Sequence, residues 1–111
     1  MADNKQVSVS NMTATQIIRY VKEQARNDDN IVLTRHTRWD RMGKRRIGPA
    51  DIARVLRLGR MIREPEPGKN YPNEVKCRFQ HTDHDLKPIS VEVAISDDDP
   101  SLIIITVIRH A

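Results

Sequence analysis

Two segments decide the fold of this chain, Val75-Lys-Cys-Arg-Phe-Gln-His81 and Ile89-Ser-Val-Glu-Val-Ala-Ile95. In both of them apolar residues recur at every second position, a period typical of a β-strand with one buried and one polar face. The segment His81-Thr-Asp-His-Asp85 between them has the composition of a hairpin turn. The two segments therefore predict an antiparallel pair of strands.

More strands are predicted on either side of this pair. Asp97-Asp-Asp-Pro100 indicates a turn, and the segment 102–108 after it is apolar on both faces, as in a strand with neighbours on both sides. A shorter strand is expected near 60–63, followed by a proline-rich loop over 64–73. Together these segments predict an antiparallel sheet of about four strands.

The first half of the chain has helical periodicity instead. Thr13 and Gln16 fit a capping box at the start of a helix over about 14–26. A second helix is expected over about 35–45, and a third ends at Gly59. With residues 1–12 as a flexible arm, residues 13–111 form a single α+β domain of two layers, N-terminal helices packed on the sheet.

Length and composition limit the class of protein. The chain has 111 residues, 38% of them hydrophobic, which suits one domain with one core. Cys77 is the only cysteine, so no disulfide forms within the chain and a reducing compartment is expected. No apolar run approaches the roughly 18 to 20 residues of a membrane span. These features predict a cytoplasmic protein without a membrane partner.

The net charge of +4 is unevenly distributed. Residues 1–63 hold 14 basic and 6 acidic side chains, whereas residues 64–111 hold 5 and 9. Basic residues at helical spacing predict a surface that binds phosphates and depends on salt. Such a surface can equally be a solvated helix face, or can dock an acidic protein partner. The basic residues assigned to it are Arg35, Arg38, Arg41, Lys44, Arg54 and Arg57.

A block of residues in this basic region resembles a known family. The block runs His36-Thr-Arg-Trp-Asp-Arg-Met42, Arg45-Arg-Ile47, Asp51-Ile52, Val55-Leu56 and Gly59, and Ile103-Ile-Ile-Thr-Val107 follows in the last strand. Over about residues 31–108 the chain resembles the small bacterial family called domain of unknown function 4258. That family is placed with compact endoribonuclease toxins such as barnase, EndoU-type, colicin-type and RelE-type enzymes. The resemblance implies RNA cleavage without a metal ion, by helices packed on a four-stranded antiparallel sheet.

Cleavage of RNA without a metal ion needs groups that move protons and cations that hold the phosphate. His36 is the candidate for proton transfer, since histidine titrates near neutral pH. Arg45 or Arg46 would hold the phosphate, and Thr106 would assist by hydrogen bonding. Alternatively, His36 simply pairs with Asp40 one helical turn away, and Thr106 is an ordinary strand residue.

The polar face of the two alternating segments is a second candidate site. Lys76, Arg78, Gln80 and Glu92 would emerge together if the strands pair around their turn. This surface is either the solvent face of the sheet or an RNA-binding groove with Glu92 as a base. The histidines and aspartates of the turn 81–85 are typical of any polar turn, so no metal site and no cofactor are predicted.

The sequence therefore predicts a toxin-like RNA-binding protein or a metal-independent endoribonuclease. Its expected partners are RNA and an acidic protein such as an antitoxin. The alternative is a non-catalytic binding module whose basic helical face docks an acidic protein or a nucleic acid.

Overall fold

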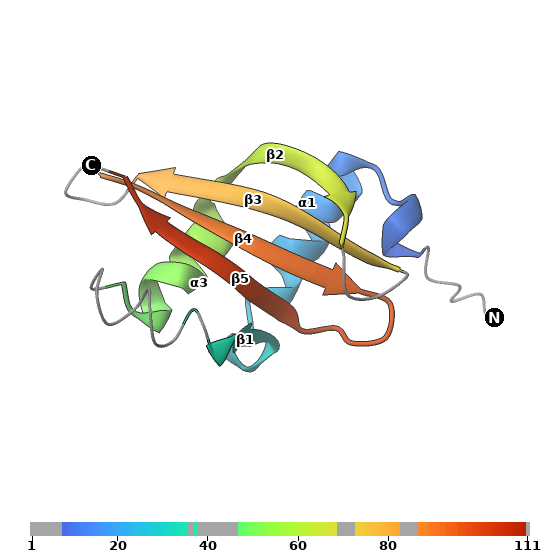
Figure 1. Cartoon of the computed structure of the whole chain (residues 1–111), viewed down its shortest axis with the longest axis horizontal. Coiled ribbons are helices and arrows are strands. Elements are labelled where there is room, and N and C mark those ends of the chain that lie inside the picture. Colours follow the sequence, from blue (N-terminus) through green and yellow to red (C-terminus); the bar gives the residue numbers. More distant parts are fainter. Residues whose placement is uncertain (1–7, 36, 38–46, 69–72, 83–86, 111) are drawn as a thin grey trace.

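The computed structural model describes residues 8–35, 37, 47–68, 73–82 and 87–110. Within them the chain forms an α+β fold with a mixed sheet (Figure 1). The helical elements are η1 (Val9–Asn11), α1 (Ala14–Gln24), η2 (Asp28–Asn30) and α3 (Pro49–Leu58). The strands are β1 (Ile31–Leu33), β2 (Arg60–Pro67), β3 (Glu74–Thr82), β4 (Pro88–Ser96) and β5 (Leu102–Arg109).

The sheet has five strands in the order β1-β5-β4-β3-β2. β2 to β5 are antiparallel neighbours, as predicted, whereas β1 pairs in parallel with β5, with Ile31 opposite Leu102. The four predicted antiparallel strands are present, and the prediction is wrong only in that it lacks the fifth strand, β1, which makes the sheet mixed. A strand of three residues is too short to show alternation, and a parallel neighbour far along the chain leaves no turn signal. β5 has a neighbour on each side, as its apolar sequence predicts.

The strand pattern continues further than predicted at the proline-rich segment. β2 begins at Arg60 and extends to Pro67, so residues 64–67, expected in a loop, belong to the sheet. β2 is an edge strand, and its pairing with β3 shifts register on both sides of Arg63. Proline has no backbone N–H to donate to a neighbouring strand. It is therefore tolerated at a sheet edge and at bulges, where that hydrogen bond is not needed.

The first described helix is fixed by its cap and by two buried residues. Thr13 accepts from the backbone N–H of Gln16 at 3.2 Å, and the Gln16 side chain accepts from that of Thr13 at 2.8 Å. The predicted capping box is thus confirmed. α1 buries Ile17 and Val21 and ends at Gln24, two residues before the predicted end of the helix.

The helix α3 begins with Pro49 in its first turn, where a missing N–H costs nothing. It buries Ile52, Val55 and Leu56 and is followed by Gly59, as predicted. Gly59 must be glycine because of close approach: a Cβ there would lie 2.4 Å from the carbonyl oxygen of Val55 and 2.7 Å from that of Gln80. The end of α3 is therefore held directly against β3.

One face of the sheet and the two helices enclose the core. Figure 1 shows α1 and α3 together behind the sheet, with the opposite face toward the viewer. Phe79 is fully buried at 0% exposure, worth about 2 to 3 kcal/mol relative to an exposed ring. The core from the sheet consists of Val75, Cys77, Phe79, Ile89, Val91, Val93, Ile95, Leu102, Ile104 and Val107.

The segment before α1 is packed against this core from Ser8 onward. Val9 is 3% exposed and belongs to the core. Its backbone N–H donates to the Asp97 carboxylate at 2.8 Å, and the Ser8 hydroxyl donates to the same carboxylate at 2.6 Å. Of the arm predicted over residues 1–12, the part from Ser8 is thus fixed to the turn between β4 and β5, because one apolar side chain and one carboxylate anchor it. Residues 1–7 lie outside the described residues.

The helix predicted over 35–45 lies almost wholly outside the described residues. Thr37 is described and is fully buried. Its hydroxyl oxygen lies 3.1 Å from the carbonyl oxygen of Ile104 and 3.2 Å from that of Ile105. β1 ends at Leu33, so beyond that point the Thr37 side chain, in place of a strand, contacts the backbone carbonyls of β5.

Candidate functional site

Alternation along β3 and β4 places Lys76, Arg78 and Glu92 on the sheet face opposite the core residues. This face lies away from α1 and α3, which Figure 1 shows behind the sheet. Arg78 on β3 is paired with Glu92 on β4, and Glu92 with Thr106 on β5. Arg63 on β2 is the partner of Arg78 and extends the same line. We call Arg63, Arg78, Glu92 and Thr106 the Glu92 row. Cross-strand partners lie about 4.5 to 5.5 Å apart at their Cβ atoms, so these side chains are direct neighbours.

Two guanidinium groups converge on one carboxylate oxygen in this row. Oε2 of Glu92 lies 3.3 Å from Nη2 of Arg78 and 4.0 Å from Nη1 of Arg63. The side chains of Glu92, Arg78 and Arg63 are 11%, 24% and 52% exposed, so the cluster opens to solvent through Arg63. A carboxylate this buried needs cations beside it, because removal of a charge from water is costly. Glu92 in turn holds the two arginine side chains next to each other.

Arg78 is incompletely satisfied. Its Nε atom is buried and has no hydrogen-bond partner among the described residues. Guanidinium groups present five N–H donors in one plane, a geometry that matches the oxygens of a phosphate. Because Nε is buried, a ligand can reach Arg78 only through its terminal N–H groups.

The next row on the same face contains a hydrogen-bonded chain. The Ser90 hydroxyl donates to Oε1 of Gln80 at 3.0 Å and lies 2.8 Å from Nε2 of His110. A serine hydroxyl has a single hydrogen, so when Ser90 donates to Gln80 the imidazole must donate from Nε2 to Ser90. The backbone N–H of His110 also donates to the carbonyl of Pro88 at 2.9 Å, which fixes the residue beside β4.

On the other side of the Glu92 row, a third cation, Lys76 of β3, lies beside β2. Nζ of Lys76 is 3.5 Å from Oε1 of Glu66, and the Lys76 side chain is 22% exposed. Lys76, Arg78 and Arg63 thus place three positive charges on one face, with two carboxylates beside them.

The structure separates the predicted site residues into two surfaces. Lys76, Arg78 and Thr106 lie on the polar sheet face, and the sequence-based expectation that Lys76, Arg78, Gln80 and Glu92 emerge together is matched by their register. Arg54 and Arg57 lie on α3, in the helical layer. Arg35 is exposed just after β1. The remaining predicted residues, His36, Arg38, Arg41, Lys44, Arg45 and Arg46, lie outside the described residues, and their roles stay predictions.

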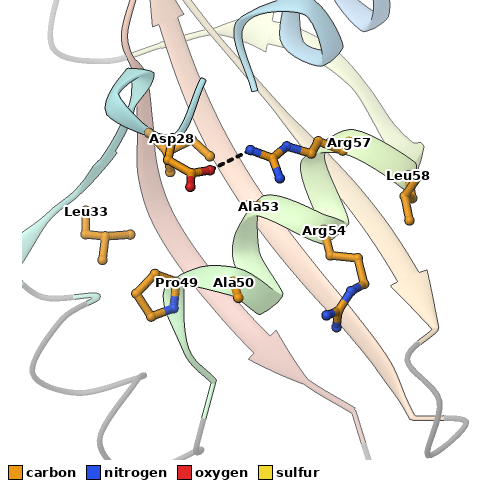
Figure 2. Close-up of a pocket in the computed structure, with 9 residues that line it drawn as sticks. Asp28, Leu33, Pro49, Ala50, Ala53, Arg54, Arg57 and Leu58 are labelled. Carbon is orange, nitrogen blue, oxygen red and sulfur yellow. Dashed lines mark hydrogen bonds and ion pairs between the residues drawn. The ribbon is translucent and has the colours of Figure 1, made fainter. Parts of the chain in front are cut away.

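Arg54 and Arg57 line an open groove of about 730 Å³ between α3 and the segment that leads into β1 (Figure 2). Both arginines are already paired. Nη2 of Arg57 contacts Asp28 at 2.5 Å, and Nη1 of Arg54 contacts Asp51 at 3.4 Å. Leu58, 66% exposed, lines the same groove and does not face the core.

Sequence reasoning missed three members of the polar face. Arg63 was expected at the end of a short strand, and only the register shifts of β2 bring it to Glu92. Ser90 and His110 meet because β4 and β5 are paired to their ends. The contact between this serine and this histidine could be predicted only from the register in which the two strands pair.

The described residues show no cluster of three or more histidine, cysteine or acidic side chains that could hold a metal ion. Within the same residues, no helix is both long and apolar enough to cross a membrane.

A helical layer on one face and a row of charged side chains on the other define an α+β domain with a polar sheet surface. The family described as domain of unknown function (DUF4258) matches residues 33–109, and the chain belongs to this family. The resemblance noted from the motif block is thereby confirmed. No curated protein and no solved structure matches the chain.

Proposed function

We propose that this protein binds RNA on the polar face of its sheet and cleaves it without a metal ion. The observation that carries the proposal is the Glu92 row, in which one buried carboxylate holds Arg63 and Arg78 side by side. The placement of the family with endoribonuclease toxins is part of the proposal, as is a cytoplasmic location.

The basic side chains of this face suit an RNA backbone. Arg63 is half-exposed, and Arg78, whose side chain is 24% exposed, shares the same carboxylate oxygen of Glu92. Two adjacent guanidinium groups can bind neighbouring oxygens of one phosphate, and Lys76 in the next row can meet the adjacent phosphate. Binding of this kind recognises the charge of the backbone and depends on salt concentration.

Cleavage requires a group that removes the proton of the ribose 2′-hydroxyl. Glu92 is the carboxylate within the phosphate-binding row, and the Thr106 side chain beside it can donate a hydrogen bond to a phosphate oxygen. The arginines would stabilise the charge that develops on the phosphorus oxygens. His36, Arg45 and Arg46 remain proposed contributors.

A second candidate function is supported by the groove on α3. Leu58 is a large exposed apolar side chain, and Arg54 lies beside it with 42% of its side chain exposed. An acidic protein segment with apolar residues, such as part of an antitoxin, would suit this combination. In this alternative the protein is a non-catalytic binding module.

The two functions are separated by RNA-binding measurements on matched arginine variants. Arg63→Gln should weaken binding of a single-stranded RNA and reduce the slope of log affinity against log salt by about 0.7, the value for one phosphate contact on single-stranded nucleic acid. Arg26→Gln is the control, since Arg26 is also an exposed arginine in one ion pair, but in the turn after α1. RNA degradation should proceed in EDTA.

Equal RNA affinity of Arg63→Gln, Arg26→Gln and the unchanged protein would overturn the sheet-face proposal. Loss of affinity in Arg54→Gln alone would move the binding surface to the α3 groove.

A further inference from the structure

His110 follows β5 beside Pro88, and its imidazole reaches back to Ser90, which lies on the same face of the sheet as Glu92. Ser90, the residue that contacts His110, is two positions from Glu92 on β4, so both point to the polar face. Two residues of a strand span roughly 7 Å. With the imidazole held at Ser90, this spacing along β4 lets the carboxylate and the imidazole approach opposite sides of one phosphodiester.

The imidazole is oriented by its neighbours. Ser90 is 1% exposed and is itself fixed by Gln80, while His110 is exposed. Nε2 points to Ser90, which leaves Nδ1 as the ring nitrogen that can meet a ligand. A buried partner on one ring nitrogen and an exposed second nitrogen is the arrangement that a proton-transfer histidine requires.

We propose that His110 is the proton donor of this site and acts with Glu92 in RNA cleavage, an inference that rests on the proposed function. The Glu92 carboxylate takes the proton of the ribose 2′-hydroxyl while the 2′-oxygen forms a bond to phosphorus. The bond from phosphorus to the 5′-oxygen breaks, and its electron pair takes the proton of Nδ1–H from the imidazolium of His110. The products are a 2′,3′-cyclic phosphate and a free 5′-hydroxyl, and solvent returns the proton from Glu92 to His110.

Arg63 and Arg78 lie in the Glu92 row and hold the phosphate in this scheme. Ser90 is a positioning residue, because it contacts the imidazole and is too buried to contact substrate. Removal of the Ser90 hydroxyl should therefore reduce cleavage less than removal of the imidazole.

The test compares His110→Gln with His81→Gln, a matched histidine on the other face of β3. His110→Gln should cleave a single-stranded RNA at least 100-fold more slowly, within the range for general acid catalysis, and should bind a non-cleavable 2′-deoxy analogue within twofold of the unchanged protein. His81→Gln should match the unchanged protein in both assays. Ser90→Ala should fall between them.

A substrate with a better leaving group distinguishes proton donation from a structural role. Uridine 3′-(4-nitrophenyl phosphate) releases a phenolate that needs no proton from the enzyme. His110→Gln should therefore cleave this ester within tenfold of the unchanged protein, whereas a variant damaged in its fold or in phosphate binding would lose both activities.

Cleavage of RNA by His110→Gln at the unchanged rate would overturn the inference and leave the proposed function intact, as would equal losses on RNA and on the nitrophenyl ester. An unchanged protein that binds RNA and leaves it whole would overturn the inference together with the cleavage part of the proposed function, while the binding part would stand.

Discussion

Lys22 of α1 and Arg57 of α3 each donate to the carboxyl end of the other helix. Nζ of Lys22 lies 2.6 Å from the carbonyl oxygen of Gly59 and 3.1 Å from that of Arg57, and Nε of Arg57 lies 2.6 Å from that of Ala25. Carbonyl groups at a helix end have no partner within the helix and favour cations. The two helices thus cap each other, and this cationic pair is explained by structure without any ligand.

Arg57→Ala should therefore lower the free energy of unfolding. The expected loss is about 1 to 3 kcal/mol, because a charged hydrogen bond to a helix end and the contact to Asp28 are both removed. Arg54→Ala is the matched control on the same helix. Its ion pair with Asp51 is only partly buried and has an N–O distance of 3.4 Å, so the loss should stay below about 1 kcal/mol. Urea denaturation measures both, and equal stability of the two variants would contradict this role of Arg57.

Substitution of Glu92 should test how far the sheet face depends on its central carboxylate. Glu92→Gln leaves Arg78 and Arg63 without their shared anion and should cost about 2 kcal/mol, less than for a fully buried pair because Arg63 is half-exposed. Adding Arg78→Met should restore part of that loss, since the uncompensated charge is removed. Thermal and urea denaturation measure the stability of both single variants and of the double variant. If the losses of the two single variants simply add up in the double variant, the two residues are not coupled and the prediction is wrong.

The attachment of the N-terminal segment should depend on pH. Hydrogen bonds from Ser8 and from the Val9 amide lower the pKa of Asp97 below its ordinary value of 3.8. The folded protein then binds protons less readily than the unfolded chain, so the attachment is complete above pH 3.8 and is lost as the pH falls through the lower folded pKa. The amide resonance of Val9 should titrate with a midpoint below 3.8. This titration should vanish in Asp97→Asn and persist in the neighbouring control Asp98→Asn, and a midpoint above 3.8 would contradict it.

Cys77 should report on global unfolding. Burial, and in second place the charge of Glu92, raises the pKa of its thiol to about 12 from 9.0, and the side chain is 1% exposed. Because the thiolate is the reactive form, Cys77 should not react with a thiol reagent at pH 8 unless the protein unfolds. The unfolded thiol ionises first, so stability should decline between about pH 9 and pH 12. Rapid labelling without denaturant would show that the core is open.

The sequence identifies those elements whose signal is local. Alternation over residues 75–81 and 89–95 predicts β3 and β4, and the cap at Thr13 predicts the start of α1. β1 could not be predicted because three residues are too few to show a periodic pattern. The second half of β2 was not predicted because its prolines are typical of a loop. Val9 lies in a mostly polar, aperiodic segment, so its burial has no local signal.

The candidate site follows the same rule. Lys76, Arg78, Gln80 and Glu92 could be grouped because the register of one hairpin relates them. Arg63 and His110 reach the same face through an irregular edge strand and through the end of β5, and both placements depend on pairing across the whole sheet. The spacing of the basic residues could not predict that some of them lie on the sheet face and others on α3, because spacing along the chain does not show which layer a side chain faces.

The parallel pair of Ile31 and Leu102 has a consequence for the order of folding. Residues 32–101 lie between these two partners, so β1 can join the sheet only after β5 has been synthesised. Pairings of such long sequence separation carry a large loop-closure cost and slow folding. A nascent chain therefore holds the β1 segment, and the Thr37 contact that follows it, unpaired until nearly the whole domain has emerged.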